Sequence, residues 1–239
     1  RREREHAAAL AQALLPPEVR KALASWTAVS VVGLDGVGLV PMAWLPLADE
    51  AYLGARRNLE SWPSLPVGAT LASSSNHRSD RAALDCLLVS GVEPSDQVLA
   101  RWPGLAPLPL SERDSSALLS PYDEQRVQIL TDIAATVSGV TEASGAGATV
   151  LHFLVHGVID VTSPQPACLV LQGEASSDGL FGAHAVSALS PAALVVLAGC
   201  RTGAGPERRG DAGSADLAGA FLRNGTQAVV VSHDDITWR

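Results

Sequence analysis

Two apolar segments of the chain each end in a glycine beside a side chain that can take part in catalysis. The first, TVLHFLVHG, ends at His156 and Gly157, and the second, ALVVLAGC, ends at Gly199 and Cys200. Buried strands of parallel sheets have this composition, and neighbouring parallel strands bring their end residues to one edge of the sheet. A thiol needs a base or a nearby cation to become a nucleophilic thiolate, and histidine is suited to that role. The two segments therefore predict a Cys200–His156 dyad.

The spacing and the glycines fit this interpretation. Cys200 follows 44 positions after His156, which leaves room for the crossover that parallel strands require. Gly157 allows a substrate carbonyl to approach the backbone closely, so its N–H and that of Cys200 are candidates for an oxyanion hole.

Structural roles for the same residues remain open at this point. A cysteine at a strand end is more often packed than reactive, and a histidine there is more often a hydrogen-bonded core residue. His152 lies four residues before His156 and shares its face of a strand, either in the core or as a support. Cys86 and Cys168 lie inside apolar segments and are expected to serve packing. Spacing alone does not decide between a dyad and two structural residues.

The composition and the net charge of the chain limit the kinds of molecule that it is expected to bind. The 239 residues are 47% hydrophobic and 18% charged, which is typical of a globular protein. A net charge of −8 disfavours nucleic acid. No apolar run reaches the ~18 residues of a membrane span, so no membrane partner is expected. Three cysteines without a framework pattern favour a reducing, cytoplasmic location.

No cofactor and no metal are expected. The chain has no Cys-x-x-Cys spacing for structural zinc. The segments GLDGVG and GAGPERRG miss the dinucleotide and phosphate-loop patterns.

Short apolar strands that alternate with helices predict an α/β fold with a parallel sheet covered on both faces. The helix across 121–138 has the strongest pattern, with Ser120 as its cap and Gly139 as its end. Residues 102–120 are expected to form a loop. The other expected elements are two helices in 5–26, a hairpin over 28–47, strands at 69–75, 84–94 and 149–157, a hairpin from 167–173 and 176–182, a helix at 183–189, a strand at 193–200, a helix at 215–225 that stops at Gly225, and a strand at 227–232.

Three segments together resemble a known family. VLHFLVHG, SSDGLFGAHAVSALSPAALVVLAGCRTGAG and GSADLAGAFLRNGTQAVVVS are similar to the CHAT domain, a caspase-like family often attached to tetratricopeptide repeats. The resemblance covers most of residues 150–232. It implies a caspase–hemoglobinase fold, a mainly parallel sheet flanked by helices, and cysteine endopeptidase activity. It also implies that His156 and Cys200 are the catalytic residues and that the backbone of Gly157 and Cys200 forms the oxyanion hole.

The resemblance also bears on organisation and partners. It implies a single domain over residues 1–239, with helices, a hairpin and the first strands in 1–145 and the catalytic part in 146–239. The domain is expected to be cut from a longer protein. Its partners are expected to be a protein substrate and a tetratricopeptide or other regulatory domain in the same or a partner chain, in bacterial defence or regulated cell death.

The end of the sequence departs from the family pattern, which commonly has a Leu-Trp-x-Val-x-Asp type segment after the last strand. Here the last strand is followed by SHDDITWR, with Asp234 and Asp235 early in the segment. Asp234, Asp235 and Asp160 are therefore candidates for an S1 pocket that selects a basic P1 residue by charge. For each of these aspartates taken singly, a polar turn after a strand is the more usual explanation.

Two other functions fit the same residues. One is a binding or scaffold module whose site has decayed, although both dyad residues are present. The other is a cysteine hydrolase that acts on a small molecule. The reactivity of Cys200 towards alkylating reagents separates an activated thiolate from a packed thiol.

Overall fold

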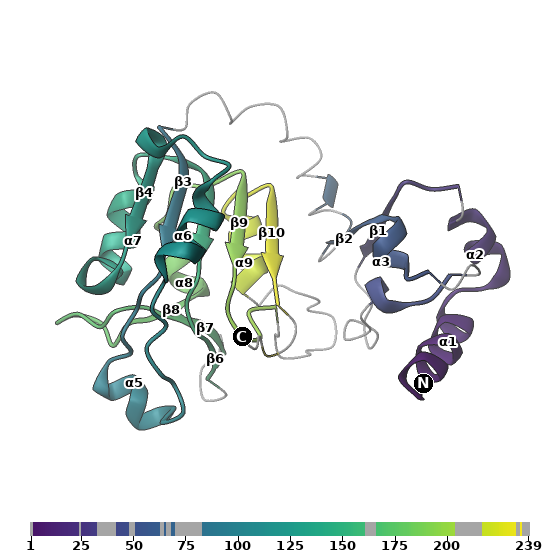
Figure 1. Ribbon diagram of the computed structural model, residues 1–239, viewed down its shortest axis with the longest axis horizontal. Helices are drawn as coiled ribbons and strands as arrows, with labels where there is room; N and C mark the ends of the chain where they lie inside the picture. The colour runs from purple at the N-terminus through teal and green to yellow at the C-terminus, as the bar shows by residue number, and fades with distance from the viewer. Residues whose placement is uncertain are drawn as a thin grey trace. The chain divides into compact units, whose positions relative to one another are not determined.

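The computed structural model describes residues 2–23, 25–32, 42–47, 51–62, 65, 68–69, 83–160, 166–203, 217–232 and 235. The chain divides into two compact units, Arg1–Gly68 and Ala69–Arg239. Each unit has its own strands and helices, which are labelled in Figure 1.

The smaller unit begins with two helices, as the sequence predicts. Helices α1 (Arg2–Leu14) and α2 (Pro17–Leu23) are separated at Pro16, and Pro17 opens the second helix. The buried core that the structure describes in this unit is small. Its buried members are Ala11, Leu15, Leu23, Leu45 and Leu53.

The described residues of 28–47 do not form the expected hairpin. Strand β1 (Ala28–Val32) pairs in parallel with β2 (Asn58–Trp62), a strand much later in the chain. Where the second arm of the hairpin was expected, the chain forms the short 3₁₀ helix η1 (Met42–Trp44). Helix α3 (Leu53–Arg56) then leads into β2. Apolar composition predicted strand structure here but could not predict the partner of β1.

The larger unit contains a five-stranded sheet in the order β10-β9-β5-β3-β4, and every neighbouring pair is parallel. This sheet, flanked by helices, confirms the predicted α/β fold class. Its strands come from both sides of residue 145. Their bounds are β3 (Leu84–Val89), β4 (Val127–Leu130), β5 (Ala148–Phe153), β9 (Leu194–Leu197) and β10 (Ala228–Val231).

Helices cover both faces of this sheet (Figure 1). One face packs against α7 (Val137–Ser144), α8 (Ala183–Val186) and α9 (Leu217–Arg223), and it carries most of the core. Three phenylalanines meet in that core, with ring centroids 5.6 to 6.4 Å apart: Phe153, Phe181 and Phe221. The opposite face packs against the apolar side chains of α6 (Glu112–Leu119) and its flanking loops.

A second, smaller sheet begins immediately after His156. Its antiparallel strands are β6 (Gly157–Ile159), β7 (Ala167–Val170) and β8 (Leu180–Gly182). The pairing of β7 with β8 confirms the expected hairpin. Helix α5 (Asp96–Arg101) packs on this sheet through the fully buried side chain of Val98.

The helix expected across 121–138 is wrong. The segment forms the 3₁₀ helix η3 (Glu124–Arg126), strand β4, the 3₁₀ helix η4 (Asp132–Ala134) and the first turn of α7. Apolar residues at helical spacing produced the error, but β4 gains backbone pairing along β3. Tertiary pairing of this kind overrides local helical preference. Gly139 lies inside α7, which begins at the cap of Thr136.

The structure confirms some of the other expected helices and strands and corrects others. Residues 102–120 are only partly a loop, because Ser111 caps α6 there. The strand at 84–94, the helix that stops at Gly225 and the final strand are confirmed in their main parts, and Gly225 has a φ of +97°. Apart from Ala69, the strand expected at 69–75 lies outside the described residues.

Candidate active site

The sheet brings His156 and Cys200 to the same edge. Strands β5 and β9 are parallel neighbours, and the last residues paired between them are Phe153 and Leu197. His156 lies three residues after Phe153, and Cys200 lies three residues after Leu197. Both residues therefore leave the carboxyl edge of the sheet at the same height, from adjacent strands.

Backbone packing holds the two ends together. A Cβ atom added to Gly157 would lie 2.1 Å from the carbonyl oxygen of Cys200. A Cβ atom added to Gly199 would lie 3.0 Å from the nitrogen of Gly157 and 2.6 Å from the carbonyl oxygen of Val155. Any side chain at either glycine would collide with the neighbouring backbone. Glycine is required at both positions because the two loops are in van der Waals contact.

The imidazole of His156 is oriented by a residue that the sequence did not indicate. Its Nε2 atom lies 2.6 Å from the carbonyl oxygen of Ala106, in the loop between α5 and α6. A carbonyl oxygen only accepts hydrogen bonds, so Nε2 carries the hydrogen in this contact. In the neutral ring Nδ1 is then the nitrogen that can accept a proton.

The loop that carries Ala106 is fastened to the small sheet by α5. The hydroxyl of Ser95, at the start of α5, donates to the carbonyl oxygen of Asp178 at 2.8 Å. At the other end of the helix, the guanidinium of Arg101 forms an ion pair with the carboxylate of Asp160. Between them, Val98 packs on β6 and β7. These contacts fix the segment from which the carbonyl of Ala106 reaches His156.

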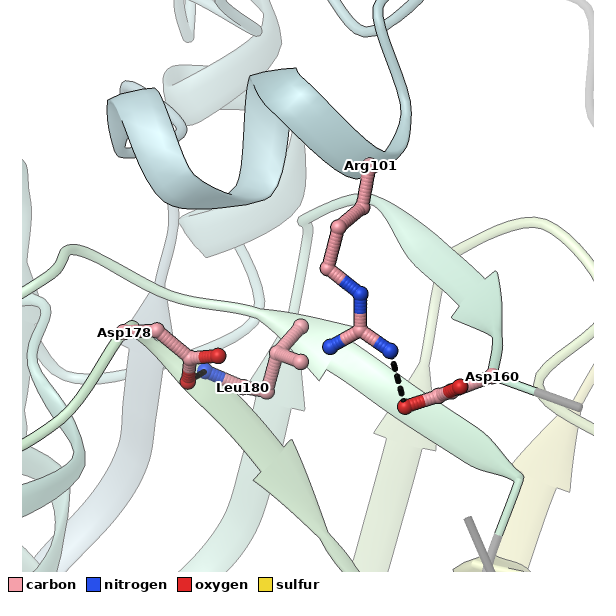
Figure 2. Close-up of polar contacts among 4 residues, drawn as sticks. All are labelled: Arg101, Asp160, Asp178 and Leu180. Atoms are coloured by element: carbon pink, nitrogen blue, oxygen red, sulfur yellow. Dashed lines mark hydrogen bonds and ion pairs between the residues drawn. The ribbon is translucent and has the colours of Figure 1, made fainter. Parts of the chain in front are cut away.

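The candidate S1 aspartates lie in different surroundings. Figure 2 shows the side chain of Arg101 directed from α5 towards Asp160, which follows β6, while Asp178 lies on the other side, next to Leu180. Asp160 is largely buried, and its charge is compensated by Arg101. Asp235 is exposed and lies 2.9 Å from Nε of Arg201, the residue after Cys200. Asp234 lies outside the described residues.

The backbone turns sharply just after Cys200. Arg201 has a φ of +52°, in the left-handed region that few residues other than glycine adopt. Cys200 itself is partly exposed, whereas Cys86 and Cys168 are buried. The chain thus presents one of its three cysteines at the surface, on a constrained turn.

These differences predict how the thiols react. Burial, assisted by Asp85 beside Cys86 and by Asp160 beside Cys168, raises the pKa of both thiols to about 11. A pKa that lies two units above the ordinary thiol value reduces the thiolate fraction about a hundredfold. Iodoacetamide at neutral pH is therefore expected to label Cys200 well before the other two, as followed by peptide mass spectrometry. Equal labelling rates at all three cysteines would contradict this assignment.

His152 lies on β5 and is partly buried, and this burial predicts a pH effect on stability. Burial lowers its pKa below the ordinary value of 6.5, because the charged imidazolium is poorly solvated there. The unfolded chain then takes up this proton at a higher pH than the folded chain. Stability from this group is complete above pH 6.5 and is lost as the pH falls below it. Urea unfolding of His152→Gln is expected to show a weaker loss on acidification, whereas the exposed-site control His184→Gln should follow the wild type.

A cavity of about 610 Å³ lies elsewhere in the larger unit, between the start of α5 and the loop that contains Gly173 and Glu174. None of His156, Gly157 and Cys200 lines it. Among the described residues, no cluster of His, Cys, Asp and Glu side chains could hold a metal ion. The described part of the chain also has no helix with the length and hydrophobicity of a membrane span.

The architecture is that of caspase-like proteins: a parallel α/β sheet with a histidine and a cysteine at the ends of neighbouring strands. The family model of the CHAT domain matches residues 4–238, which is almost the whole sequence. The chain therefore belongs to the CHAT domain family, a caspase-like protease family. The comparison with curated proteins gave no match.

Proposed function

We propose that the chain is a cysteine endopeptidase in which Cys200 is the nucleophile and His156 the general base. The observation that carries the proposal is the equal position of the two residues beyond the last paired residues of β5 and β9. Contact between the backbones of Gly157 and Cys200 supports it, because that contact keeps the two loops together. Membership of a caspase-like family adds the reaction class.

The first step is transfer of the Cys200 proton to Nδ1 of His156, whose Nε2–H stays bonded to Ala106. The thiolate sulfur attacks the carbonyl carbon of the substrate peptide and forms a tetrahedral oxyanion. The oxyanion collapses as the C–N bond breaks, and the imidazolium gives its proton to the leaving amine. Water, activated by the neutral imidazole, then hydrolyses the thioester and restores the Cys200 thiol.

The oxyanion would be stabilised by the backbone N–H groups of Gly157 and Cys200. Support comes from the closeness of the two loops, which places the nitrogen of Gly157 next to Gly199. Preorganised donors of this kind each lower a barrier by roughly 3 kcal/mol.

For the P1 side chain we propose a site that includes Asp235 and Asp234. Asp235 is bound to Arg201, immediately after the nucleophile, so a basic P1 side chain would compete with Arg201 for its carboxylate. Asp160 could contribute only after its ion pair with Arg101 opens. The substrate that we propose is a protein with a basic P1 residue. An attached or partner regulatory domain would control its cleavage.

The test is cleavage of a peptide library derived from a proteome, followed by mass spectrometry. Wild type is compared with Cys200→Ala and with the matched variant Cys168→Ala, which removes a buried thiol of the same chain. We expect cleavage with an enriched basic P1 residue in wild type and Cys168→Ala, and none in Cys200→Ala. Equal cleavage by Cys200→Ala would refute the proposed function. An enriched P1 residue that is not basic would refute the role of the aspartates alone.

A further inference from the structure

Thr202 lies two residues after Cys200 and is one of the few buried polar residues of the described chain. Only 2% of it is exposed to solvent. A buried hydroxyl without partners destabilises a protein, so its contacts show what the residue is for. The contacts of its hydroxyl are made to the backbone just before Cys200 and to the backbone of Ser232.

The hydroxyl of Thr202 joins the ends of two strands. Oγ1 can donate to the carbonyl oxygen of Leu197, at 3.0 Å, or to that of Gly199, at 3.3 Å, both at the end of β9. It accepts from the backbone N–H of Ser232, which follows β10, at 3.0 Å. The N–H of Gly203 donates to the carbonyl oxygen of Ser232 at 2.8 Å and strengthens the same link. The turn after Cys200 is thereby tied to the segment that leads to Asp235.

The methyl group of Thr202 has a separate contact. Its Cγ2 atom lies 3.1 Å from the position that a Cβ atom on Gly157 would take, and 3.2 Å from that position on Gly199. The methyl therefore packs against the two glycines through which the loops of His156 and Cys200 meet. Serine would keep the hydroxyl bonds and lose this contact, and valine would do the reverse.

We infer that Thr202 is a positioning residue for the Cys200 turn and that its hydroxyl is the part that acts. The hydroxyl holds the turn, which has a left-handed residue at Arg201, in register with the backbone after β10. This inference rests on the proposed endopeptidase function. It extends that function by linking the nucleophile to the segment proposed to select the P1 side chain.

The experiment compares Thr202→Val, Thr202→Ser and the control Thr226→Val on a peptide that the wild type cleaves. Thr226 is also fully buried, but its hydroxyl has no hydrogen-bond partner among the described residues, so its loss should matter little. We expect Thr202→Val to lower kcat by about tenfold or more with little change in KM. The substitution removes the hydroxyl that bonds Leu197 and Ser232, and the backbone groups of both residues lose this partner. Thr202→Ser should restore most of kcat, and Thr226→Val should remain within about twofold of wild type.

A wild-type kcat in Thr202→Val would overturn the inference while the endopeptidase function stands. Equal losses in Thr202→Val and Thr202→Ser would also overturn it, because the methyl contact would then matter as much as the hydroxyl. If the wild type cleaves nothing, the proposed function fails, and hydrogen exchange at the Ser232 amide tests the link directly. Faster exchange in Thr202→Val than in Thr226→Val supports the link, and unchanged protection refutes it.

Discussion

Replacing His156 with alanine is expected to reduce peptide cleavage at least about a hundredfold, because a general base contributes that much or more to such reactions. The imidazole is the group that would accept the Cys200 proton, and its orientation is set by the 2.6 Å contact of Nε2 with Ala106. Steady-state kinetics on a peptide cleaved by the wild type would measure the effect as a fall in kcat/KM. The alkylation rate of Cys200 should fall in the same variant, since the nearby base is gone.

His184→Ala provides the matched control, because His184 is an exposed histidine on α8. It should cleave as the wild type does. Thermal unfolding of both variants separates a loss of chemistry from a loss of fold. If His156→Ala retained wild-type cleavage and a normal unfolding temperature, the dyad would be wrong even though both residues reach the same edge of the sheet.

Gly157→Ala is expected to have an effect as large as that of His156→Ala, for a different reason. The added Cβ would lie 2.1 Å from the carbonyl oxygen of Cys200, which is a backbone atom and cannot move aside as a flexible side chain would. The loops of His156 and Cys200 must therefore separate. A misplacement of about 1 Å at a catalytic centre can reduce the rate about a hundredfold. We expect kcat to fall by at least that factor.

The control for this substitution is Gly104→Ala, the same chemical change at an exposed glycine where a Cβ atom would meet nothing within 4 Å. That variant should keep wild-type cleavage and stability. Should Gly157→Ala also retain full activity, the contact between the two loops would have no catalytic role. The crystal structure of the variant would then show how the loops accommodate the methyl group.

The sequence predicted the central part of the candidate site because strand ends are encoded locally. TVLHFLVHG and ALVVLAGC are apolar runs that stop at glycine, and parallel neighbours necessarily deliver their ends to one edge. The prediction required only that β5 and β9 be adjacent, which the sheet order confirms. The sequence predicted that Gly157 leaves room for a substrate carbonyl, whereas in the structure a side chain at Gly157 would meet the carbonyl oxygen of Cys200.

The contacts that complete the site could not be predicted. Ala106 acts through its backbone carbonyl, which every residue type has. The residue type at position 106 therefore does not indicate this contact with His156. Thr202 is a common residue in a polar turn, and its role depends on Ser232, which lies 30 residues further along the chain. The strand β4 was mistaken for a helix because its apolar residues have helical spacing, while the pairing with β3 that decides its conformation is a tertiary interaction.

The two ion pairs change how the candidate S1 residues are understood. In sequence, Asp160 and Asp235 were equivalent acidic residues after strands. In the structure, Asp160 lies largely buried against Arg101 on α5, whereas Asp235 is exposed and bound to the residue after Cys200. Charge on the surface near the nucleophile can attract a basic side chain, and charge already compensated inside the fold cannot do so without rearrangement. Asp235 is therefore the first of the three to vary in tests of specificity.

Rapid acid quenching of the enzyme during turnover of a cleaved peptide would show whether Cys200 is the nucleophile. Intact-mass and fragmentation mass spectrometry would then locate any covalently attached peptide. We predict a thioester between the sulfur of Cys200 and the carboxyl end of the N-terminal product. This thioester should be absent from Cys200→Ala. An acyl group on a different residue, or wild-type cleavage by Cys200→Ala, would contradict it.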